Sequence, residues 1–107
     1  MYSIKTDSNI DIIRTVIEQD SPGSEIIIFG SRATGTADNS SDYDLLVKIN
    51  TGLSVTEKRS LASHIRKHLA EKLIDSDVII RDESEIAASI DRNGSVTKEA
   101  VLTGIRI

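Results

Sequence analysis

Residues 25–49 read EIIIFGSRATGTADNSSDYDLLVKI, two apolar runs joined by a small and polar connection. The first run, Glu25–Phe29, is rich in β-branched residues and is bounded by glycines, which is typical of a buried strand. The second run, Asp42–Ile49, alternates between apolar and polar residues, so it predicts a strand with two different faces. Between them, Ser31–Thr36 favours a short helix that begins where the first strand ends.

The remaining sequence places helices and a third strand around this pair. Apolar residues at helical spacing predict a helix over Ser8–Gln19, with Ser8 as its cap. A capping box predicts a helix over Ser54–Lys72, and a strand follows at Ser76–Ile80. Beyond a predicted helix over Glu83–Arg92 the tail is ambiguous, and its apolar residues favour a strand at Val101–Ile105. This order predicts an α/β fold, a small mixed β-sheet with flanking helices.

Length and composition exclude several classes of protein. The 107 residues allow one domain, residues 1–107. A formal net charge of −4 opposes bulk nucleic-acid binding, and the absence of cysteine excludes disulfides and thiolate sites. The longest apolar run, Ile26–Phe29, is too short for a membrane span, and Met1–Ile10 has no apolar signal core. We therefore expect a cytoplasmic protein with no membrane partner.

The predicted core is thin, because only 3% of the residues are aromatic and the core must consist mostly of Ile, Leu and Val. A domain of this size buries a modest share of its surface when it folds. A partner surface would add to its stability, so we expect a homo-oligomer or a hetero-oligomer.

Carboxylates open two of the predicted strands. Asp42 and Asp44 are two residues apart, so their side chains project to the same side of a strand, and a neighbouring strand can bring Asp77 to the same place. Asp75 lies on the same strand face as Asp77 and is the alternative third carboxylate. Closely spaced carboxylates repel one another unless cations lie between them. Magnesium is the natural counter-ion because it prefers hard oxygen ligands and substrate phosphates.

The Gly30-Ser31 pair supplies a second element of this site. A residue without Cβ lets the backbone approach a phosphate, and the start of the following helix offers free amide donors. Two magnesium ions held by carboxylates can clamp the attacking and leaving oxygens of an in-line displacement. The ordered combination of strand, Gly-Ser, ten intervening residues, Asp-x-Asp and strand therefore indicates a centre for nucleotidyl transfer.

Other interpretations of these residues are weaker. Gly30 and Gly35 have Walker A spacing, but Thr36 stands where that loop requires Lys, so a P-loop NTPase is rejected. His64 and His68 lie four apart on a predicted helix, yet the zincin glutamate is absent, which favours a solvated face. Each candidate residue also has a purely structural interpretation. Asp42 and Asp44, and likewise Ser31, would then only cap a turn. Asp77 would be a solvated strand residue, and Arg32 would be a surface charge.

Three segments resemble a known family: GSRATGTA at 30–37, SDYDLLV at 41–47 and DVII at 77–80. They closely resemble the minimal nucleotidyltransferases (MNT) of the DNA polymerase β-like superfamily, which occur in prokaryotic toxin–antitoxin pairs beside a HEPN-domain ribonuclease. The resemblance implies the polymerase β-like nucleotidyltransferase fold. One departure is Glu99–Thr103, which lacks the Gly and Tyr that often occur near the C-terminus of the family.

The resemblance also assigns roles to residues. It implies Asp42 and Asp44 as ligands of two magnesium ions, with Gly30 and Ser31 on the nucleoside triphosphate. It implies that the third carboxylate, Asp77, binds one metal ion and helps to deprotonate the acceptor hydroxyl. The basic residue at position 32, Arg32, is expected to touch phosphate.

By the same resemblance, the expected activity is magnesium-dependent transfer of a nucleoside monophosphate, AMP from ATP, to an acceptor hydroxyl. The implied acceptor is a tyrosine of a partner HEPN toxin, which would make this chain an antitoxin. Two alternatives stay open: a non-catalytic antitoxin that neutralises its partner by binding, and transfer to a small molecule such as an aminoglycoside.

Overall fold

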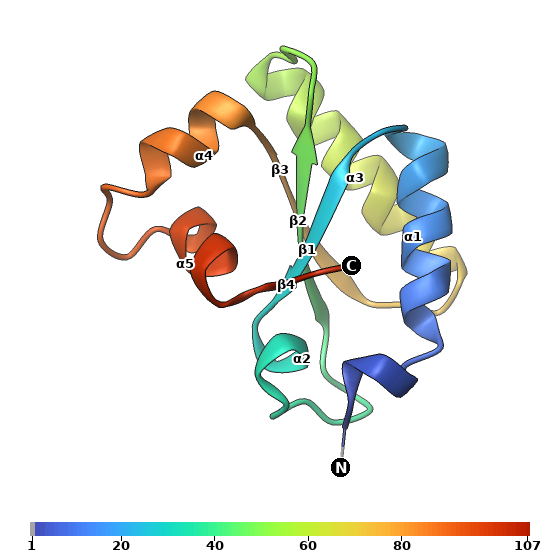
Figure 1. Ribbon diagram of the computed structural model, residues 1–107. Coiled ribbons are helices and arrows are strands. Elements are labelled where there is room, and N and C mark those ends of the chain that lie inside the picture. Colours follow the sequence, from blue (N-terminus) through green and yellow to red (C-terminus); the bar gives the residue numbers. More distant parts are fainter. Residues whose placement is uncertain (1) are drawn as a thin grey trace.

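A computed structural model describes residues 2–107 and contains a four-stranded mixed sheet with the strand order β3-β2-β1-β4 (Figure 1). Strands β1 (Glu25–Phe29) and β2 (Tyr43–Ile49) are antiparallel, and β3 (Ser76–Asp82) runs parallel to β2. The short β4 (Ile105–Arg106) pairs antiparallel with β1 on its other side. The predicted α/β class and small mixed sheet are confirmed.

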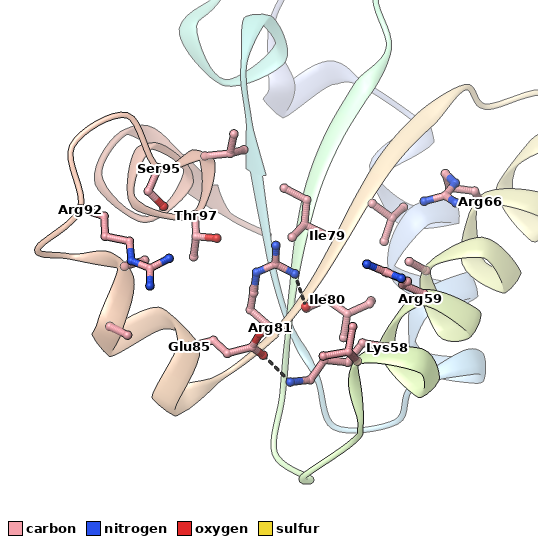
Figure 2. Close-up of a pocket in the computed structure, with 16 residues that line it drawn as sticks. Lys58, Arg59, Arg66, Ile79, Ile80, Arg81, Glu85, Arg92, Ser95 and Thr97 are labelled. Atoms are coloured by element: carbon pink, nitrogen blue, oxygen red, sulfur yellow. Dashed lines mark hydrogen bonds and ion pairs between the residues drawn. The ribbon is translucent and has the colours of Figure 1, made fainter.

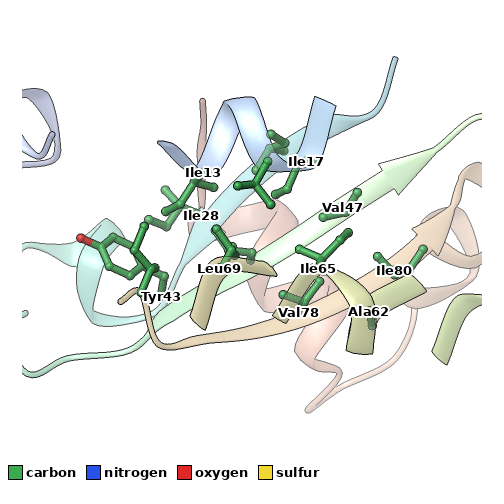
Figure 3. Close-up of a cluster of buried hydrophobic side chains, with 14 of the residues drawn as sticks. Ile13, Ile17, Ile28, Tyr43, Val47, Ala62, Ile65, Leu69, Val78 and Ile80 are labelled. Atoms are coloured by element: carbon green, nitrogen blue, oxygen red, sulfur yellow. The ribbon is translucent and has the colours of Figure 1, made fainter. Parts of the chain in front are cut away.

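One face of the sheet carries the main hydrophobic core (Figure 3). Helices α1 (Asn9–Asp20) and α3 (Val55–Glu71) pack on this face. The 3-10 turn η1 (Ile4–Thr6) precedes α1. Alternation along β2 directs every second side chain toward these helices. The fully buried side chains of this core include Ile13, Ile28, Leu45, Val47, Ile65 and Leu69.

The other face is covered more sparsely. Helices α4 (Glu83–Ser89) and α5 (Val96–Thr103) lie on this side of the sheet, opposite α1 and α3 (Figure 1). A small cluster of buried residues, Phe29, Leu46 and Ala100, joins α5 to the sheet. The short α2 (Ser31–Thr34) follows β1 directly. None of the helices within residues 2–107 is long and apolar enough to cross a membrane.

The structure corrects the predicted tail, which forms a helix where we predicted a strand at Val101–Ile105. Ser95 caps α5 by accepting a hydrogen bond from the Lys98 amide. The helix then buries Ala100 completely against the sheet, so helical rather than alternating spacing fits this segment. Of the predicted strand, only Ile105 lies in a strand, the short β4. Gly104 joins α5 to β4, and a Cβ at Gly104 would overlap the backbone of Ala100.

Differences elsewhere are confined to the ends of elements. The predicted bounds of β1 and the capping box of α3 are confirmed. Strand β3 runs two residues beyond the predicted Ile80, because Arg81 and Asp82 continue the parallel register with β2. Helix α4 ends at Ser89 rather than Arg92, and the Ser89 hydroxyl donates to the Ile86 carbonyl oxygen at 2.7 Å.

Candidate active site

The predicted carboxylates meet on the sparsely covered face of the sheet. Asp44 of β2 is the register partner of Asp77 of β3, so the two Cα atoms lie side by side in adjacent strands. Tyr43 and Leu45 point into the main core, so Asp44 projects to the opposite face, and Asp42 lies just before β2. Asp44 is half-buried, whereas Asp42 and Asp77 are exposed. The structure thus places Asp77 beside Asp44, and Asp42 is near enough for its charge to act on Asp44.

The electrostatics of Asp44 show how close these groups are. Burial raises the pKa of Asp44 above its usual range, and the negative charges of Asp77, Asp42 and Glu99 raise it further. Glu99 reaches the site from α5 and was not among the predicted site residues. Its position depends on the helical tail, which the sequence did not indicate. Asp75 does not appear among the charges acting on Asp44, which favours Asp77 as the third carboxylate.

Gly30 lies directly against Asp44. It adopts φ 70° and ψ −152°, a conformation that side-chain-bearing residues rarely adopt. A Cβ at Gly30 would overlap Asp44 Oδ2 and would lie 3.2 Å from Asp44 Cγ. Only glycine therefore permits both the turn into α2 and the observed position of the Asp44 carboxylate.

Helix α2 begins at Ser31, immediately after this turn. The Ala33 and Thr34 amides donate to the Gly30 carbonyl oxygen at 3.0 and 3.1 Å. The first amides of a helix have no partner inside it, so those of Ser31 and Arg32 face the end of the helix. The arrangement matches the predicted phosphate-binding turn in shape, and the nucleotide role of Gly30 and Ser31 stays a prediction.

Arg32 lies in a buried polar cluster rather than at the surface. Its guanidinium donates to the Ser41 carbonyl oxygen, at 2.6 Å from Nη2, and lies 3.6 Å from Asp7 Oδ2. It is also stacked 4.8 Å from the ring centroid of Tyr2 and 4.1 Å from that of Tyr43. The predicted contact of Arg32 with phosphate stays a prediction, and the observed contacts indicate a positioning role.

Asp7 holds this cluster together. The hydroxyls of Tyr2 and Tyr43 both donate to Asp7 Oδ2, and the Asn9 amide donates to Asp7 Oδ1. Burial opposes ionisation of Asp7, but these hydrogen bonds and Arg32 outweigh it and lower its pKa. Burial and the Asp7 carboxylate raise the pKa of Tyr43 to about 12. Because Tyr43 lies between Asp42 and Asp44, the cluster fixes the backbone that carries both carboxylates.

The donor set suits a hard divalent cation. Asp42, Asp44, Asp77 and Glu99 supply only carboxylate oxygens, and none of the four takes part in an ion pair within residues 2–107. Over the same residues, no three acidic or histidine side chains form a ready ligand cluster. The carboxylates fit magnesium in chemistry. Burial is the main cause of the raised pKa of Asp44, and a bound cation would relieve the part that comes from the neighbouring negative charges.

The two histidines considered as zinc ligands contact the same acid instead. His64 Nε2 lies 3.4 Å from Asp20 Oδ1, and His68 Nδ1 lies 3.0 Å from Asp20 Oδ2. Asp20 ends α1, so both histidines join α3 to α1. The predicted solvated face fits His64, whose side chain is 68% exposed, but not His68, which is 25% exposed and contacts Asp20.

The mixed sheet, with carboxylates on adjacent strands and a Gly-Ser turn beside them, is the arrangement predicted for a nucleotidyltransferase. The family model of the nucleotidyltransferase domain matches residues 10–103, and the chain belongs to this family. This match confirms the predicted nucleotidyltransferase. A search of curated proteins found no significant match.

Solved structures extend the likeness. A chain in the crystal structure of a toxin–antitoxin complex with AMP-PNP shares 26% identity, with a TM-score of 0.61 over 92% of this chain and 71% of that chain. A chain of a mutant MntA–HpeT toxin–antitoxin complex shares 22% identity, with a TM-score of 0.59 over 94% and 72% of the two chains.

A third structure has the same fold at lower identity. It contains a tri-AMPylated Shewanella oneidensis HEPN toxin in complex with an MNT antitoxin. A chain of that structure is 20% identical to this chain, with a TM-score of 0.55 over 92% of this chain and 67% of the matched chain. The MNT-type fold predicted from the sequence is therefore confirmed.

Proposed function

We propose that residues 1–107 form a minimal nucleotidyltransferase domain that transfers AMP from ATP to a hydroxyl of a partner protein, with magnesium. The observation that carries this proposal is the packing of Gly30 against Asp44 beside Asp77. It joins the turn at the end of β1, which we assign to phosphate binding, to carboxylates on β2 and β3. In this arrangement the nucleotide lies on the β1 side of Asp44, and the acceptor approaches from the β3 side.

Each side chain then has a distinct role. Asp42 and Asp44 would hold the metal ions, and Gly30 and Ser31 would bind the triphosphate through backbone amides. Asp77 would bind one of the ions and accept the proton of the acceptor hydroxyl. A bond forms between the acceptor oxygen and the α-phosphorus, and the bond from that phosphorus to pyrophosphate breaks. The bound ions supply charge stabilisation for the attacking and leaving oxygens.

We further propose that the acceptor is a tyrosine of a HEPN toxin and that this chain is the antitoxin. The matched structures support this partner, because one is a toxin–antitoxin complex with a nucleotide analogue and another contains an AMPylated HEPN toxin beside an MNT antitoxin. The proposal of ATP rather than another nucleoside triphosphate rests on the same similarity to these structures. The cluster around Arg32 contributes by holding the strand that carries the metal ligands.

Labelling with ATP tests the proposal. The protein is incubated with α-labelled ATP and magnesium in lysate of the source organism, in parallel with Asp44→Asn. We expect label on one protein band, reduced about a thousandfold in the variant because a metal ligand is lost, which corresponds to about 4 kcal/mol on the barrier. The variant should stay folded, since removing the charge of Asp44 relieves repulsion from its neighbours.

Other outcomes separate the alternatives. Label on a small molecule or on RNA would keep the transferase and reject the protein acceptor. Full transfer by Asp44→Asn would reject the assigned site. Neutralisation of a partner by the variant without any transfer would establish the binding-only antitoxin.

A further inference from the structure

A cleft of about 910 Å³ lies along β3, one of the two edge strands of the described sheet (Figure 2). Residues 78–81 of β3 form its floor, α3 forms one wall, and α4 with α5 forms the other. We call this space the β3 cleft. It is larger than the neighbouring depression of about 410 Å³ beside Asp42.

The β3 cleft is strongly basic. Its lining includes Lys58 and four arginines, and Glu85 is the one acidic residue among the residues that line it. Glu85 is already paired with Lys58, which also contacts Asp82 at 2.9 Å. No ion pair within residues 2–107 involves the four arginines, which are Arg59, Arg66, Arg81 and Arg92. A chain with a formal net charge of −4 thus gathers uncompensated cations in one cleft.

These arginines approach the strand from both walls. Figure 2 shows Arg92 directed inward from the α4–α5 side and Arg59 from α3, with Arg81 between them. Arg81 donates to the Ile80 carbonyl oxygen at 2.8 Å. Guanidinium groups bind carboxylates through two parallel hydrogen bonds, so such a set is suited to anionic groups spaced along a chain.

The β3 cleft adjoins a depression beside Asp42, one of the proposed site residues. Arg66 of α3 lines both the cleft and this depression, whose lining also includes Asp75 and Ser76. Asp77, which faces the acceptor, lies on β3 itself. A molecule seated along this strand would therefore lead directly to the carboxylates.

The lining favours a polypeptide over a nucleic acid. Val55 and Val96 stand on opposite walls and are 62% and 51% exposed, and the exposed Ala88 adds further apolar surface. None of the lining residues is aromatic, so the β3 cleft lacks the aromatic side chains on which the bases of single-stranded nucleic acids typically stack. A peptide that alternates carboxylates with small apolar side chains would contact both the arginines and the exposed valines of the β3 cleft.

We propose that the β3 cleft docks an acidic segment of the protein that supplies the acceptor hydroxyl. This inference rests on the proposed function, because it assigns the cleft to the acceptor of that same reaction. The cleft then provides the partner affinity that orients the hydroxyl toward Asp77.

A direct binding measurement tests this proposal without any transfer step. The probe is a fluorescein-labelled peptide of alternating Glu and Val, about eight residues long and so roughly 26 Å when extended. Its matched control replaces every Glu with Gln, and an oligoadenylate of equal length tests RNA. Fluorescence anisotropy is recorded with wild type, Asp44→Asn, Arg59→Glu/Arg92→Glu, and Lys5→Glu/Lys72→Glu. The last variant changes the net charge equally at two exposed residues outside the cleft.

We expect wild type, Asp44→Asn and the lysine variant to bind the Glu peptide with equal dissociation constants. The arginine variant should raise the dissociation constant about tenfold or more, and added salt should raise it for wild type. Failure of the Glu peptide to bind, equal binding of the Gln peptide, or an unchanged arginine variant would overturn the proposal. Tighter binding of the oligoadenylate that is lost in the arginine variant would assign the cleft to RNA.

The two proposals fail separately. If label transfer is absent while the Glu peptide binds through the arginines, the proposed activity is wrong and the binding cleft stands without an acceptor role. If transfer occurs and the arginine variant labels its protein acceptor as well as wild type does, the docking role is wrong and the activity stands.

Discussion

The two faces of the sheet use the same strands for different purposes. The face toward α1 and α3 buries a continuous set of apolar side chains, with Leu45, Ile65 and Leu69 fully inaccessible. The face toward α4 and α5 buries only Phe29, Leu46 and Ala100 as a cluster and leaves room for carboxylates and arginines. Alternation along β2 makes this division possible. Stability comes mainly from one face, so the other can carry groups that repel one another.

The largest expected effect is a loss of stability on removing a core side chain, and its size should differ between the two faces of the sheet. Leu69→Ala in the main core should lower the free energy of unfolding by about 2 to 5 kcal/mol, because it leaves a cavity among fully buried neighbours. Val101→Ala on the opposite face should lower it by about 1 kcal/mol or less, since Val101 is only partly buried. Urea unfolding of both variants measures the difference. Equal losses would show that both faces contribute alike.

Gly30→Ala should have the next largest effect, and it should act on both structure and activity. The positive φ of Gly30 and the overlap of a Cβ with Asp44 Oδ2 together should cost about 2 to 3 kcal/mol of stability. Transfer should also fall, because the Asp44 carboxylate must move. Gly35→Ala is the matched control: its φ is 80°, but a Cβ there meets no atom within 4 Å. If Gly35→Ala impaired transfer as much, backbone strain rather than contact with Asp44 would be the cause.

The sequence predicted the strands and the carboxylates because both depend on local spacing. Asp42 and Asp44 share a face by the period of a strand, and their apolar neighbours determine which face that is. The tail could not be predicted in the same way, because α5 is fixed by the burial of Ala100 against strands distant in sequence. Glu99 was missed for the same reason. Arg32 was expected to touch phosphate, and its buried contacts with Asp7, Tyr2 and Tyr43 were not predicted because these partners are distant in sequence and follow no periodic pattern.

Asp7→Asn should test that buried cluster with a smaller effect. Hydrogen bonds lower the pKa of Asp7 in the folded protein, so its contribution to stability is present above the unfolded pKa of about 3.9. That contribution is lost as the pH falls through the lower, folded pKa. The variant should therefore be less stable than wild type by about 1 to 2 kcal/mol at pH 7, and the difference should shrink below about pH 4. Thermal melting across this range measures it, and a difference independent of pH would contradict the role of the charge.

Magnesium should have the smallest effect on stability, and it should act only through the carboxylates on the face toward α4 and α5. A ligand that binds the folded state alone stabilises it by about 1.4 kcal/mol at ten times its dissociation constant. Magnesium should therefore raise the melting temperature of wild type, because the cation relieves the repulsion among Asp42, Asp44 and Asp77. Asp44→Asn should lose most of this rise, whereas Asp11→Asn, at an exposed position on α1, should keep it. An equal rise in all three proteins would mean that magnesium binds elsewhere, and the two faces of the sheet would then differ in packing but not in their response to the metal.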